Sequence, residues 1–217
     1  MHRASTPSIA LATLLRTDAN TFWANLGRSR LAPVSGKFIE GALATLPPEG
    51  QILSLDDAAW RKLAGAQQIF RLHERDSIYV IKVIDVPDAF VGLHARSIIL
   101  VSQTALSLLT AEELQASLAH EAGHEYVWLD FEEARKRTDF DRLQELELFS
   151  DAVAVVTMVQ AGLDPSRLIS CFEKLIRYTR EHFERHENEA RYASSNERKM
   201  FVERIIKWAG GNPPQPR

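Results

Sequence analysis

The feature that most restricts the fold is the segment from Thr110 to about Trp128, which carries the signals of one long helix. Thr110 is expected to cap this helix, and Glu113 completes a capping box in which each side chain accepts a hydrogen bond from the other residue's backbone N–H. The pentapeptide His-Glu-Ala-Gly-His at 120–124 lies inside it. Because residues four apart share one face of a helix, the two histidines are expected one turn apart.

This pair of histidines predicts a metal site. Two imidazoles so placed can bind one Zn²⁺ through ring nitrogens at about 2.0–2.1 Å. Glu121 follows the first histidine, where it can reach a zinc-bound water without ligating the metal, which is the spacing of the zinc metalloprotease motif. Gly123 costs a helix about 1 kcal/mol relative to alanine, and this is understandable if another element approaches closely there. The alternative is that His120 and His124 are surface histidines without a metal.

A zinc hydrolase normally has a third protein ligand and one open position. Glu147 is the best candidate, on the helix that follows the intervening loop. Asp151 lies one turn further on the same face and could accept the free ring N–H of a histidine ligand, which fixes its tautomer. Both carboxylates interrupt a run that is apolar from Ala152 to Val159, and charged groups are rarely buried unless paired or metal-bound. The alternative for Glu147 is an exposed acid beside Glu145.

Other histidines are weaker candidates. His182 and His186 are also four apart, but Phe183 follows the first of them and charged residues surround the pair, so a solvated helix face is the favoured reading. His94 is expected in a loop before a strand, where it could line a cleft.

The chain divides at the Pro/Gly cluster of residues 47–50. We predict a helical arm at 1–46, a zinc metallopeptidase domain at 50–210 and a disordered tail at 211–217. Within the domain, β-branched residues predict strands, and cap signals predict helices. The strands are expected at 77–86 and 97–102. A short helix is expected from Ser54, and a longer one at about 140–161, with Gly162 as its C-terminal stop. A further helix is expected to begin with Asp164 as its cap and Pro165 at its first position and to reach the late 180s, and a last one to run from Ser194 or Ser195 to Gly210.

Composition narrows the class of protein. The 217 residues are 45% hydrophobic and 25% charged, typical of a globular chain. The net charge of −3 has no basic block, which argues against nucleic-acid binding. The single cysteine, Cys171, excludes an intrachain disulfide and is expected to be buried. The apolar stretch Ile9 to Leu15 is too short for a bilayer and a poor signal peptide, so we expect a cytoplasmic protein; a secreted one that has lost its signal is the alternative.

From Asp88 to Ile205 the sequence resembles the gluzincin metallopeptidases, in particular the family of the bacterial HtpX proteases and the CAAX-box prenyl proteases. The family's pieces occur in order. Asp88-Ala89-Phe90 is followed by a strand, by Leu118-Ala119 with the zinc motif, and by the segments 147–151 and 161–165.

The resemblance implies roles for individual residues. It makes His120, His124 and Glu147 zinc ligands, Glu121 the general base and Asp151 the partner of a ligand. It also implies that the strand near Asp88, Ala89 and Phe90 is the edge that pairs with an extended peptide.

Two departures from the family pattern matter. The family often has Asn where Asp88 stands, and it often has His-Pro six residues before an arginine of the last helix. Here Tyr192 and Ala193 precede Arg198, and Tyr192 could serve as a phenol donor to the oxyanion. Many relatives are membrane-embedded, whereas this chain shows no span, so prenylated membrane substrates are not expected.

The resemblance therefore predicts a helix-rich α+β gluzincin domain with a small sheet above the active-site helix. Its expected function is that of a zinc endopeptidase acting on peptides or unfolded proteins. Two alternatives stay open: a regulator or binding protein that keeps the fold but cleaves nothing, and a latent protease whose cleft is covered by the arm or the last helices. The sequence makes no prediction of oligomeric state.

Overall fold

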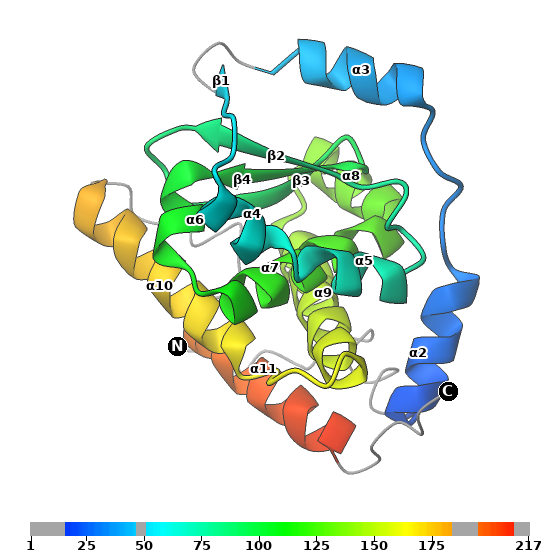
Figure 1. The fold of residues 1–217 in the computed structure, drawn as a ribbon. Helices are drawn as coiled ribbons and strands as arrows, with labels where there is room; N and C mark the ends of the chain where they lie inside the picture. Colours follow the sequence, from blue (N-terminus) through cyan, green and yellow to red (C-terminus); the bar gives the residue numbers. More distant parts are fainter. Residues whose placement is uncertain (1–15, 47–50, 184–194, 211–217) are drawn as a thin grey trace.

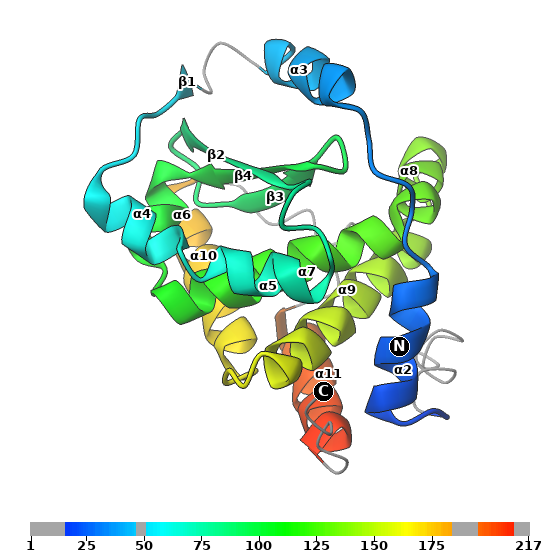
Figure 2. The same ribbon diagram turned by 45° about the vertical axis from the view of Figure 1, so that its right-hand side comes forward.

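The computed structural model describes residues 16–46, 51–183 and 195–210 and shows a helix-rich α+β domain with one small sheet (Figure 1). This confirms the predicted fold class. The sheet lies above the long helix α7 (Ala111–Tyr126), and α9 (Phe140–Gln160) crosses beneath that helix (Figure 2). The predicted tail at 211–217 and the Pro/Gly boundary at 47–50 lie outside the described residues.

The sheet has the strand order β1-β2-β4-β3. Strands β2 (Val80–Asp85) and β4 (Ile98–Ser102) are parallel and match the two predicted strands with shorter bounds. At one edge β1 (Gln51–Ile52) pairs antiparallel with β2, and at the other β3 (Val91–His94) pairs antiparallel with β4. Every residue of β4 is buried, since the sheet is covered on both faces.

The predicted caps of the two central helices are confirmed. The Thr110 hydroxyl accepts from the backbone N–H of Glu113, and the Glu113 carboxylate accepts from that of Thr110. Helix α9 ends where predicted, because Gly162 at φ 70° provides the left-handed residue that commonly follows a helix. The segment from Ala152 to Met158 of this helix is buried almost completely, at 1% exposure or less.

Several helix predictions need correction. The connection between α7 and α9 is a further helix, α8 (Trp128–Arg137), and not a loop. The short helix after β1 is capped by Asp56, whose carboxylate accepts from Ala59 N–H, so Ser54 is not its cap. Similarly, Asp164 precedes the cap, because its side chain accepts from the N–H of Ser166. The remaining domain helices are α4 (Asp57–Leu63), α5 (Ala66–Leu72), α6 (Gln103–Leu108), α10 (Arg167–His182) and α11 (Ser195–Gly210).

The described part of the arm packs onto the domain. Helix α2 (Ala19–Arg28) buries Phe22 and Leu26 in the main core, and α3 (Gly36–Ala44) covers the outer face of the sheet (Figure 2). Between them, the backbone carbonyls of Leu31 and Ala32 accept hydrogen bonds from two arginines of the domain, Arg75 and Arg96. Both helices and their linker are thus integral to the fold.

Cys171 is fully buried, as predicted, and burial raises the pKa of its thiol to about 12. Within the ranges that the structure describes, no helix is both long enough and apolar enough to cross a membrane.

Candidate metal centre and cleft

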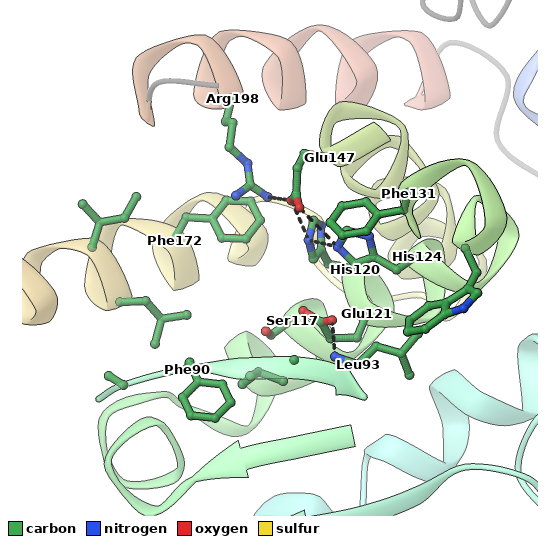
Figure 3. Close-up of a pocket in the computed structure, with 16 residues that line it drawn as sticks. Phe90, Leu93, Ser117, His120, Glu121, His124, Phe131, Glu147, Phe172 and Arg198 are labelled. Carbon is green, nitrogen blue, oxygen red and sulfur yellow. Dashed lines mark hydrogen bonds and ion pairs between the residues drawn. The ribbon is translucent and has the colours of Figure 1, made fainter. Parts of the chain in front are cut away.

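His120, His124 and Glu147 converge from α7 and α9, and their ligating atoms all lie within 4.8 Å of one another (Figure 3). The two Nε2 atoms are 3.1 Å apart. Glu147 Oε2 lies 3.4 Å from His120 Nε2, and Glu147 Oε1 lies 3.7 Å from His124 Nε2. All three side chains are buried.

These separations fit one zinc ion. Ligands that bind a tetrahedral Zn²⁺ at about 2.0–2.1 Å are themselves about 3.3 Å apart. The three separations, from 3.1 to 3.7 Å, bracket that value. Two nitrogens and a carboxylate oxygen are also a donor set that catalytic zinc sites use. The residues present therefore fit the metal that the sequence predicts.

The approach of α9 to α7 depends on Gly123. A Cβ atom added there would lie 2.8 Å from Ser150 Cα and 3.0 Å from Ser150 O, closer than side chains tolerate. The Ser150 hydroxyl in turn lies 3.3 Å from His124 Nδ1. A glycine between the two histidines thus allows the helix that carries Glu147 to come within ligand distance.

We expect Gly123→Ala to separate the two helices and to weaken zinc binding. Overpacking of this kind typically destabilises a protein by about 1–3 kcal/mol. Thermal unfolding of the metal-free protein and a zinc-competition titration would measure the two effects. Gly41→Ala is the matched control, since a Cβ at that helical position meets nothing within 4 Å. Zinc affinity equal to the wild type in Gly123→Ala would contradict this account of the crossing.

Asp151 links His120 to a buried arginine. Its Oδ1 lies 2.8 Å from His120 Nδ1, and it accepts two hydrogen bonds from Arg198 of α11, at 2.6 and 2.9 Å. The Arg198 guanidinium also lies over the Phe172 ring, 3.7 Å from its centroid, and 3.9 Å from Glu147 Oε2. A fully buried carboxylate with two cationic neighbours stays ionised and can hold the His120 ring in place.

For Asp151→Asn we expect zinc affinity to fall about 10- to 100-fold, the usual cost of losing the group that orients a ligand. The amide has the shape of the carboxylate but no charge, so the ring of His120 is held less firmly. A competition titration with a chromophoric chelator would measure the change. Asp130→Asn removes a solvent-exposed carboxylate and serves as the control. Unchanged affinity would show that Asp151 does not orient a ligand.

Glu121 lies beside the three ligating side chains without belonging to the cluster. It is buried, and its Oε2 accepts a 2.7 Å hydrogen bond from the backbone N–H of Leu93 on the edge strand β3 (Figure 3). Burial raises the pKa of Glu121 to about 7 in the metal-free protein. The hydrogen bond fixes the direction in which the carboxylate points, toward the space between α7 and the strand.

Burial and neighbouring charges give the ligating groups different proton affinities. Burial lowers the pKa of His124 to about 4. Burial also opposes charge on His120, but its contacts with Asp151 and Glu147 prevail and raise its pKa to about 9. Burial would raise the pKa of Glu147, yet the two histidines hold it at about 2. Glu147 therefore stays ionised beside the two imidazoles, as a metal-binding carboxylate must be.

The centre opens into a cleft of about 410 Å³ between α7, β3, α8 and α10. The structure corrects the predicted edge segment. The paired strand begins at Val91, so Asp88, Ala89 and Phe90 precede it. Ala89 and Phe90 line the cleft together with Val91, Gly92 and Leu93, whereas Asp88 is not one of the lining residues.

The backbone of β3 offers bonding groups to the cleft. Phe90 accepts from Ser102 N–H, so in this antiparallel ladder the even-numbered residues face β4. Val91 and Leu93 therefore direct their N–H and C=O groups away from β4, and the bond from Leu93 to Glu121 agrees with this alternation.

Other candidate residues lie elsewhere. His94 is the last residue of β3 and does not line the cleft. His182 is exposed at the end of α10, with its ring stacked on Tyr178. Tyr192 and His186 lie outside the described residues. In the sequence, Arg198 stands out only as part of the family pattern. Its position 47 residues after Asp151 gave no local signal of their pairing.

Comparison with known proteins supports the prediction made for helix α7. Residues 58–127 match the sequence model of Peptidase family M48. The matched stretch runs from α4 to the end of α7 and includes His120, Glu121 and His124; it ends before Glu147. No match was found among curated proteins.

Proposed function

We propose that the protein is a zinc-dependent endopeptidase in which His120, His124 and Glu147 hold the metal and Glu121 is the general base. The observation that carries the proposal is the convergence of these three ligating side chains on one point, with a buried carboxylate beside them and outside the cluster. The match of residues 58–127 to a peptidase family supports it independently. The closer relationship to the HtpX and CAAX-box proteases rests on the sequence resemblance and forms part of the proposal.

The geometry suggests how the chain's own residues would act. Bound zinc would supply Lewis acidity and lower the pKa of a coordinated water. Glu121, oriented by the Leu93 N–H, would take a proton from the attacking water and pass it to the leaving amine. Asp151 and Arg198 would keep His120 in its ligating orientation. No covalent intermediate with the protein is needed.

The substrate would be an extended peptide or unfolded segment that adds a strand to β3. Val91 presents both backbone groups to the cleft, and such pairing gives affinity that does not depend on side-chain identity. One alternative was a latent protease whose cleft is covered by the N-terminal arm. The described residues of the arm do not support it, because neither α2 nor α3 contributes to the cleft lining. Helices α10 and α11 contribute lining residues, among them Phe172 and Arg198.

The proposal is tested with the purified full chain. Elemental analysis should find about one zinc per chain, and casein hydrolysis should stop on chelation and return with added zinc. Zinc without hydrolysis of casein or of a broad peptide library would favour the binding-protein alternative. Absence of both zinc and hydrolysis would overturn the proposal.

A further inference from the structure

The charges in the cleft are confined to its centre. Of the described residues that line it, the ionisable ones are His120, Glu121, His124, Glu147 and Arg198. Each of these has a charged or hydrogen-bonding neighbour within the site. Both ends of the cleft, in contrast, are walled by apolar and aromatic side chains (Figure 3).

One end is formed by α10. Phe172, Leu175 and Ile176 follow the i, i+3, i+4 spacing, so they share one helix face, and all three line the cleft. Phe172 lies across the cleft from Phe90 (Figure 3). The Phe172 ring is fixed by Arg198 on its face and by a T-shaped contact with His120, at 5.5 Å between ring centroids. This end, the α10 wall, is therefore preformed.

The other end, the α8 wall, consists of Trp128 and Phe131. Phe131 makes a T-shaped contact with His124, with ring centroids 5.1 Å apart. Only Val127 separates α7 from α8, so the wall has a short connection to the metal-binding helix. The two walls thus lie on opposite sides of the centre, each touching one of the two histidines (Figure 3).

Such walls select side chains. An apolar side chain is stabilised when it leaves water for these surfaces, whereas a charged one loses its hydration there. We infer that the cleft accepts extended segments that carry apolar side chains on both sides of the scissile bond.

This inference rests on the proposed function, and a binding measurement separates the two. Glu121→Gln protein, with and without added zinc, is titrated with fluorescent peptides that differ only at the two central positions. We expect apolar pairs to bind at least about tenfold more tightly than pairs with lysine or aspartate. Even a single methylene group in an apolar pocket changes affinity by about this factor. Equal affinity for all pairs would overturn the inference, whether or not the wild type cleaves. Apolar preference without any cleavage by the wild type would support the inference and contradict the proposed function.

A charge placed on the α10 wall sharpens the test. Leu175→Asp puts a carboxylate into the lining of the cleft. We expect the ratio of affinities for lysine-containing over apolar peptides to rise at least about tenfold. Leu175→Asn is the uncharged control and should not gain lysine binding. Leu129→Asp adds the same charge at an exposed position outside the cleft, 65% exposed, and should behave as the wild type. An equal shift in Leu129→Asp, or none in Leu175→Asp, would show that the α10 wall does not contact the substrate.

Discussion

Replacing Glu121 with glutamine is expected to lower the hydrolysis of casein by at least about 10²-fold, the lower end of what a positioned general base contributes. Glutamine keeps the size of the side chain and can still accept the hydrogen bond from Leu93 N–H. It cannot accept the proton of the attacking water. Because Glu121 is outside the cluster of ligating atoms, zinc content and thermal stability should stay close to the wild type.

Glu133→Gln provides the matched control, since it makes the same substitution at an exposed position of α8. The measurement must use the full chain. Removal of the arm would uncover the core that Phe22 and Leu26 fill, so its effect on activity could not be separated from unfolding. Equal activity of Glu121→Gln and wild type, with zinc present in both, would contradict the role of Glu121 even though the metal site is intact.

The sequence predicted those features of the fold and the site that depend on residues close together in the chain. The capping box at Thr110 and the glycine stop at Gly162 depend on residues a few positions apart, and both appear in the structure. The same holds for the spacing of His120 and His124 on one face. Glu147 and Asp151 were recognised because an acid inside an apolar helix needs a partner, and both are buried as that argument requires.

The features that the sequence did not reveal depend on tertiary contacts. Helix α8 is rich in charged residues and has only one buried residue, Ala134, so its pattern resembles a loop. The edge strand was placed too early because Gly92 and His94 weaken the strand pattern, and its bounds are set by pairing with β4. Ser54 and Asp56 are both acceptable caps, and only the structure shows which one accepts the bond.

The walls of the cleft also depend on tertiary contacts. Phe131 and Phe172 read in sequence as ordinary apolar positions of two helices, 41 residues apart by their numbering. Their contacts with His124 and His120 arise because α8 and α10 both pack beside α7. A sequence that predicts the reacting centre therefore does not by itself predict which side chains meet the substrate.

The histidine pair makes the strongest prediction about the metal. His124→Ala should abolish stoichiometric zinc binding, because a site with one histidine and one carboxylate loses a ligand and its tetrahedral arrangement. A ligand that binds the folded state stabilises that state by RT ln(1 + [L]/Kd), where [L] is the free ligand concentration. Chelation should thus lower the unfolding temperature of the wild type and leave that of His124→Ala unchanged. Elemental analysis and calorimetry with and without chelator would measure both effects.

His182→Ala distinguishes the metal pair from the other histidine pair. His182 is exposed, stacks on Tyr178 and lies outside the cleft lining, so its replacement should preserve both the zinc content and the response to chelation. If His182→Ala lost zinc while His124→Ala retained it, the wrong pair would have been assigned. The comparison is decisive because both variants remove one imidazole from a helix, and among the described residues it is His124 that has a second imidazole and a carboxylate directed at the same point.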